Sequence, residues 1–262
     1  MYLIGLVAYF KSMIKRYLYI VAMLMLTAGN AVAKEPPVIV ELFTSQGCAA
    51  CPTASSLISK LASEDENIVP FIWAVDYWDY LGWQDTMAIE ASGTRQEAFN
   101  TSMNKNGVFT PQVIINGAVQ TIGSREGEIR QLIKEQTETH PKMLEVHLAG
   151  GLHDAYVKIG NYAEGLENAV VTVIWFKNAE TVRIASGDNR GKLFHYTNVV
   201  RATHEFGALK NFRIDKQGFA SLGIEYDRIG TLDANCLAVM VQESVGGKII
   251  GFAKINFAEL AN

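Results

Sequence analysis

Two cysteines, Cys48 and Cys51, lie between a short apolar run and a helical pattern, and this arrangement most constrains the fold. The run 38–43 is apolar and rich in β-branched residues, which indicates a buried strand. After the cysteines, apolar residues recur at the spacing of one helix face. They are Ala54, Leu57, Ile58 and Leu61. Because a second apolar run follows at 68–75, we predict a β-α-β unit with parallel strands.

The pattern continues with further elements on the amino-terminal side of residue 141. They are a helix at 94–104, strands at 112–115 and 118–122, and a last helix that Ser124 caps. Asn116-Gly117 between the two strands is a strong hairpin signal. We expect Arg95 and Glu97 on the exposed side of the first helix. The order β-α-β-α-β-β-α predicts a mixed sheet with helices on both faces and a hairpin at one edge.

The character of the sequence changes after residue 141. Short strand-like runs, turn signals and little helical periodicity indicate a β-rich, sandwich-like second part. The clearest runs are 144–148, 156–159, 170–176, 237–241 and 249–255. We therefore predict two domains, an α/β domain at 34–140 and a β-sandwich-like domain at 141–262.

The amino-terminal segment resembles a targeting signal rather than a folded element. Positive residues precede an apolar run at 17–28, and Ala31-Val32-Ala33 follows it. This layout predicts a secretory signal peptide at 1–33, with 1–12 as an over-extended start before Met13. An uncleaved anchor is the alternative, although the run is shorter than the roughly 20 residues of a membrane span. We expect an exported protein, periplasmic or secreted, with no stable membrane span after cleavage.

Composition narrows the classes of partner. Apolar residues make up 49% of the chain and the net charge is -4, with no dense run of Lys or Arg. Such a chain can build a core, and it lacks the clustered positive charge that phosphate contacts need. Nucleic acid is therefore not an expected partner. All three cysteines follow the signal segment, so export would expose them to an oxidising compartment.

The spacing of Cys48 and Cys51 points to thiol chemistry. The start of a helix carries free N–H groups and partial positive charge, which favour a thiolate there. Pro52 suits the first helical turn. A zinc site is a second interpretation, but the usual second C-x-x-C or spaced histidine pair is absent from the sequence. A structural disulfide is a third, although closing so short a loop removes little chain entropy.

Three other segments are candidates for a role at the site. In the aromatic loop 76–83, Asp76 and Trp78 are candidate substrate contacts, and Asp76 is a candidate proton acceptor for Cys51. The alternative is that this loop packs against the second domain. Cys236 in an apolar run indicates a buried, inert thiol or, less simply, a resolving thiol. The polar stretch 188–192 indicates a solvated turn.

A later Thr110-Pro111 opens the predicted hairpin. A strand, C-x-x-C, a helix and then Thr-Pro before a hairpin resembles the thioredoxin superfamily. That resemblance implies a cis Pro111 beside the cysteines, with Thr110 offering backbone hydrogen bonds to a substrate. An ordinary trans proline at a strand start is the alternative. Most of the chain is also similar to a secreted bacterial domain-of-unknown-function family, number 1223. The matching blocks are 41–52, 76–83, 109–112, 188–191 and 198–201.

The resemblance implies a thioredoxin-like first domain and an exported protein, and it leaves the function open. Together with the cysteine chemistry, it leads us to expect a thiol–disulfide oxidoreductase. Cys48 would attack and Cys51 would resolve the mixed disulfide. Thr110, Pro111, Asp76 and Trp78 would bind the substrate, a protein or a small thiol or disulfide. The redox-active disulfide Cys48–Cys51 would serve in place of an organic cofactor or metal. The alternative is a non-catalytic binding module with a structural disulfide, or a module for thiol-based metal handling.

Overall fold

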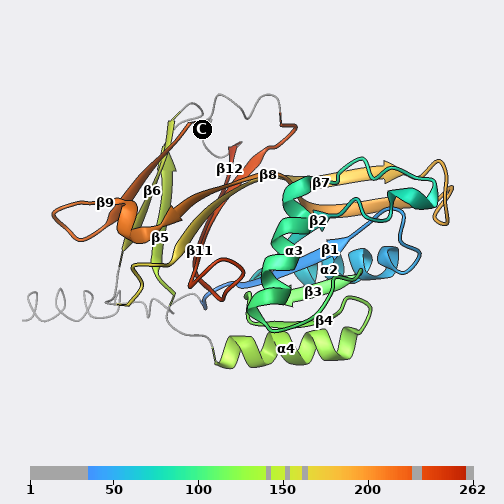
Figure 1. Ribbon diagram of the computed structural model, residues 1–262, viewed down its shortest axis with the longest axis horizontal. Helices are drawn as coiled ribbons and strands as arrows, with labels where there is room; N and C mark the ends of the chain where they lie inside the picture. The colour runs from blue at the N-terminus through green and yellow to red at the C-terminus, as the bar shows by residue number, and fades with distance from the viewer. Residues whose placement is uncertain (1–34, 140–142, 151–153, 161–164, 226–231, 258–262) are drawn as a thin grey trace, which may run out of the picture. The chain divides into compact units, whose positions relative to one another are not determined.

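The first half of the chain has the order of elements that the sequence predicts. A computed structural model describes residues 35–139, 143–150, 154–160, 165–225 and 232–257 (Figure 1). The predicted signal peptide and the predicted boundary at 141 lie outside these residues. The elements are β1 (Val38–Thr44), α2 (Cys51–Glu64), β2 (Ile68–Ala74), the 3-10 turn η1 (Asp79–Leu81), α3 (Glu90–Ser102), β3 (Gln112–Ile115), β4 (Val119–Ile122) and α4 (Glu126–Glu138).

Helix α3 differs from the prediction in its start and in its exposed face. It begins at Glu90 rather than 94, because several of its buried residues are polar and therefore give no apolar periodicity. Arg95 was expected to be exposed, and this is wrong. Its side chain is only 11% exposed and pairs with Glu41, which is completely buried in β1. A buried carboxylate needs such a partner.

The second half consists mainly of strands in the part that the structure describes. They are β5 (Glu145–Gly150), β6 (Asp154–Gly160), β7 (Val170–Arg183), β8 (Leu193–Ala208), β9 (Arg213–Ile214), β10 (Ala220–Glu225), β11 (Cys236–Gln242) and β12 (Ile249–Asn256), with a 3-10 turn η2 (Leu209–Asn211). β7 and β8 are long strands of 14 and 16 residues. The apolar run 170–176 marks only the first half of β7, because the residues of the second half are half-buried or exposed.

Strands from both halves of the chain share one eight-stranded sheet, in the order β12-β11-β7-β8-β2-β1-β3-β4. β1 pairs with β2 in parallel and with β3 in antiparallel, as the predicted unit and hairpin require. β8 joins β2 through the parallel pair Ile72 and Val199. The predicted boundary near 141 therefore does not separate two sheets, and 36–262 clusters as one compact unit.

The helices cover opposite faces of this sheet (Figure 1). Apolar residues of α2 and α4 share a core with alternate residues of β1, such as Val40 and Leu42. Phe99 of α3 packs with the other set, including Phe43. A smaller sheet, β5-β6-β10-β9, packs on β7 and β11 through a third apolar cluster. The result is a mixed α/β fold. Helices cover the part of the large sheet that contains β1–β4, and the small sheet covers the part that contains β7 and β11.

Candidate functional site

Cys48 and Cys51 lie where β1 ends and α2 begins, and both are free thiols. Cys51 is the first residue of α2, and its N–H donates to the Cys48 carbonyl oxygen at 3.2 Å. No side chain caps this end of the helix, and Pro52 occupies its first turn. The free N–H groups of the turn therefore remain available to a negative charge on Cys48.

The two thiols have opposite electrostatic environments. A hydrogen bond from the Cys51 thiol, helped by the N–H groups of Ala50 and Cys51, lowers the pKa of Cys48 to about 6, although burial opposes this. Burial raises the pKa of Cys51 far above its usual range, and the charge on Cys48 adds to the effect. At neutral pH the pair thus holds one thiolate, on Cys48, and one proton, on Cys51.

Thr110 and Pro111 lie next to the cysteines, as expected. The bond between them is cis, and the Cys48 sulfur is 3.8 Å from the Thr110 carbonyl oxygen. Gly123 donates its N–H to the Pro111 carbonyl oxygen at 2.8 Å. A Cβ on Gly123 would lie 2.9 Å from the Pro111 Cβ and 3.0 Å from that of Ala54 in α2. Only glycine therefore lets this proline approach the helix that carries Cys51.

Trp78 belongs to the same cluster through a hydrogen bond to Thr110. The Trp78 Nε1–H donates to the Thr110 hydroxyl oxygen at 2.6 Å. A Cβ on Gly47 would lie 3.2 Å from the Trp78 carbonyl oxygen, so the aromatic loop lies directly against the turn before Cys48. Asp76 is exposed, and no hydrogen bond among the described residues joins its carboxylate to Cys51.

The turn before Cys48 is fixed by side chains that sequence reasoning missed. Asn189, only 1% exposed, donates from Nδ2 to the carbonyl oxygens of Gln46 and Cys48, each at 2.9 Å. The Asp85 carboxylate accepts the Gln46 N–H at 2.7 Å, and the Trp83 Nε1–H donates to the Gln46 side chain at 2.7 Å. The turn is thereby clamped from both sides.

Asp85 is a buried carboxylic acid whose pKa is higher than usual. It is 6% exposed, and burial raises its pKa to about 6 even though the N–H groups of Gln46 and Met87 favour the ionised form. Asp79 adds to the rise in pKa, and its carboxylate also accepts the Asp85 N–H at 3.0 Å. The carboxyl group of Asp85, which titrates near pH 6, is therefore hydrogen-bonded directly to the turn that holds Cys48.

Comparison with known proteins places this arrangement in a family. Residues 39–242 match the family described as "Protein of unknown function (DUF1223)". The chain belongs to this DUF1223 family. A search of curated proteins found no match. The fold is similar to a crystal structure of a protein from Agrobacterium tumefaciens, with 26% identity, a TM-score of 0.69, and coverage of 86% of this chain and 96% of that one.

Two interpretations of the DUF1223 chain need correction. The stretch 188–192 is not simply a solvated turn, because the long β7–β8 hairpin carries Asn189 to the cysteines. Its resemblance to a family block was the available signal. A resolving role for Cys236 is also wrong, since β11 lies four strand spacings from β1, about 19 Å at the usual spacing. Cys236 is instead buried in the core with Phe176.

The site offers few groups for a metal. Among the described residues, no cluster of three or more histidine, cysteine or acidic side chains has metal-binding geometry. In the same part of the chain, no helix is long and apolar enough to cross a membrane.

Proposed function

We propose that this DUF1223 protein is an exported thiol–disulfide oxidoreductase with a thioredoxin-like arrangement of β1, α2, β2 and the β3–β4 hairpin. The observation that carries the proposal is the position of Cys48 at the start of α2, in hydrogen-bond contact with a protonated Cys51 and 3.8 Å from Thr110. Such a pair combines an attacking thiolate with a buried proton-bearing partner. Export is supported by the amino-terminal pattern at 1–33.

The first step is attack of the Cys48 thiolate on a substrate disulfide. A bond forms between the Cys48 sulfur and one substrate sulfur, the substrate S–S bond breaks, and the second substrate sulfur leaves as a thiolate. Because the pKa of Cys48 is about 6, most of the protein is in the attacking form at neutral pH.

The second step uses Cys51. Its proton passes to solvent or to the departing thiolate, and its sulfur attacks the Cys48 sulfur of the mixed disulfide. The Cys48–Cys51 disulfide forms and the remaining substrate sulfur leaves, so the substrate gains two electrons and the protein loses two. The reverse sequence oxidises a dithiol substrate. Burial keeps the pKa of Cys51 raised throughout, and formation of the mixed disulfide removes the part of that rise that the charge on Cys48 causes.

The surface beside the pair suits a polypeptide or another disulfide with an apolar neighbour. Trp78 stacks on Tyr80 with 6.1 Å between ring centroids, and Tyr80 is 77% exposed. Phe109 is also exposed and directly precedes Thr110. An incoming chain would meet this aromatic surface while its backbone bonds to Thr110, next to Pro111.

The experiment that tests the proposal is trapping of the mixed disulfide. Purified protein with Cys51→Ala and Cys236→Ser is mixed with oxidised glutathione, and the adduct is measured by mass spectrometry. We expect one stable glutathione adduct on Cys48, because the resolving thiol is missing. The matched variant Cys48→Ala with Cys236→Ser should form the adduct at least about 100-fold more slowly, since a raised pKa leaves little thiolate. Equal rates in the two variants would contradict the proposal.

A second candidate function is a non-catalytic binding module, and the small exposure of Cys48 favours it. Cys48 is only 5% exposed, so a substrate disulfide must reach a sulfur that is largely covered. Alkylation of the reduced protein distinguishes the two. A module predicts a rate at least about 100-fold below that of an accessible thiolate, whereas the oxidoreductase predicts fast alkylation of Cys48 alone.

A further inference from the structure

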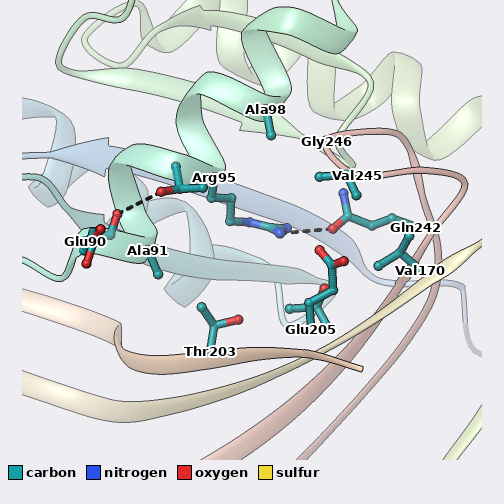
Figure 2. A pocket seen from close by; sticks show the side chains of 12 residues that line it. Glu90, Ala91, Arg95, Ala98, Val170, Thr203, Glu205, Gln242, Val245 and Gly246 are labelled. Atoms are coloured by element: carbon teal, nitrogen blue, oxygen red, sulfur yellow. Dashed lines mark hydrogen bonds between the residues drawn. The ribbon is translucent and has the colours of Figure 1, made fainter. Parts of the chain in front are cut away.

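A pocket lies between α3 and strands β7, β8 and β11, apart from the cysteines (Figure 2). Its volume is about 360 Å³, within the usual range of small-molecule pockets. In Figure 2, Glu90 and Arg95 of α3 lie on one side and Thr203 of β8 lies on the other. None of the residues assigned to the cysteine site lines this pocket.

Arg95 lines the pocket, but its positive charge is neutralised by an ion pair with Glu41. Its Nε and Nη2 donate to the two carboxylate oxygens of Glu41 at 2.5 and 2.9 Å. Its Nη1 donates to the Gln242 side-chain oxygen at 3.0 Å, the bond drawn in Figure 2. Because Glu41 neutralises the guanidinium, Arg95 is a structural wall and not a receptor for an anion.

The uncompensated charge of the pocket is negative. Glu90 on α3 and Glu205 on β8 both line it and are exposed. Within the described part of the chain, no Lys, Arg or His forms an ion pair with either carboxylate. Because Glu41 neutralises the charge of Arg95, the lining carries two negative charges, one on each side of the pocket. These charges attract a cation and repel an anion.

The rest of the lining combines apolar side chains with the hydroxyl groups of three threonines, Thr94, Thr172 and Thr203. The apolar part of the lining consists of the side chains of Ala91, Ala98, Val170 and Val245. Thr172 is 6% exposed as a whole residue. The Thr172 hydroxyl is not among the buried polar atoms that lack a partner. It faces the pocket, where it is available to bond to solvent or to a ligand.

We propose that this pocket binds a small aliphatic cation of the alkylamine or diamine class. The ammonium groups bind to Glu90 and Glu205 through charge-assisted hydrogen bonds, and the methylene chain lies against the alanine and valine side chains. The Thr172 hydroxyl bonds to an N–H group of the ligand. This site is separate from the cysteine pair and does not depend on the proposed redox function.

The test is isothermal titration of the full exported chain with putrescine, butanol and butyrate. We expect saturable binding of putrescine only, since butanol lacks the charge and butyrate has the wrong sign. Glu90→Gln and Glu205→Gln should each weaken the affinity about 10-fold. Thr172→Val should weaken it about 5-fold, the effect of one neutral hydrogen bond.

Two matched variants control this experiment. Glu97→Gln removes the same charge from an exposed position of α3 outside the pocket and should change the affinity less than about 2-fold. Cys48→Ser should bind putrescine normally, which separates this proposal from the redox one. The proposal is overturned if putrescine shows no saturable binding up to about 10 mM. It is also overturned if Glu97→Gln weakens binding as much as Glu205→Gln, or if butyrate binds equally well.

Discussion

Only two residues separate Cys48 from Cys51, yet hydrogen bonds lower the pKa of Cys48 while burial raises that of Cys51. The residue pattern alone predicted that Cys48 would sit at a helix start, where a thiolate is favoured. It did not predict how strongly Cys51 would hold its proton, because that depends on burial by residues distant in sequence. The sequence also gave no sign of Asp85 as a buried acid, since its partners are backbone N–H groups.

The rate at which Cys48 is alkylated should follow its own ionisation. In a Cys236→Ser background, the rate of reaction with iodoacetamide should rise with pH to a plateau, with a midpoint at about pH 6. Below that pH the thiolate is protonated and unreactive. Cys51→Ala removes the main hydrogen-bond donor, so the midpoint should move up towards the ordinary thiol value, about 8.5. A wild-type midpoint at that ordinary value would contradict this account.

Asp85 should make the folded protein lose stability as pH rises. Its pKa is raised from 3.8 to about 6, so the folded state binds its proton more tightly than the unfolded state. This contribution is fully present below about pH 4 and is lost as pH rises through about 6. Measured by urea unfolding between about pH 3 and about pH 8, which brackets both pKa values, the wild type should lose about 3 kcal/mol relative to Asp85→Asn. Asp76→Asn, at an exposed position near the same loop, is the control and should keep the wild-type slope.

At the scale of elements, the long β7–β8 hairpin decides the geometry of the site. The hairpin carries Asn189 to the turn before Cys48, while α3 carries Gln96, whose side chain donates to the Phe109 carbonyl oxygen at 2.8 Å. The order of the first seven elements was predictable, because strand and helix periodicities are local. The length of β7 and its contact with the site were not, because half of that strand is amphipathic and its partner lies far along the chain.

Asn189→Ala should therefore affect the cysteines from a distant part of the sequence. It removes two hydrogen bonds to the turn, which should cost about 1–3 kcal/mol of unfolding free energy. It should also raise the pKa of Cys48, because the turn no longer holds the sulfur against the helix end. Alkylation pH profiles report this change. Asn178→Ala, which removes an exposed hydrogen bond in β7, should leave the profile unchanged, and an equal shift in both variants would contradict the clamp.

At the scale of the whole molecule, residues from the two halves of the chain pack together in common hydrophobic cores. The core under α2 contains Phe194 and Tyr196 of β8, and the core under α3 contains Phe176 of β7 and Met240 of β11. The sequence correctly indicated a β-rich second part but placed a domain boundary near 141. Local pattern cannot reveal that β8 pairs with β2, because strand pairing between distant segments leaves no mark on either one.

This sharing predicts that the first half does not fold alone. A segment of residues 36–139 lacks the strands that cover β2 and would expose apolar residues of two cores. Its far-ultraviolet circular dichroism and proton NMR spectra should be those of an unfolded chain. The chain 36–262 should unfold in one cooperative transition by both circular dichroism and tryptophan fluorescence. A folded 36–139 segment, or two separate transitions, would show independent domains instead.

The central claim is that Cys48 and Cys51 exchange electrons with a substrate, and the reduction potential of the pair tests it most directly. The chain with Cys236→Ser would be equilibrated in glutathione buffers, and its thiols then trapped and counted by mass spectrometry. We expect a potential between roughly -120 and -270 mV, the range of working oxidoreductases. A pair that stays oxidised well below about -300 mV would be a structural disulfide, which would contradict the proposed function.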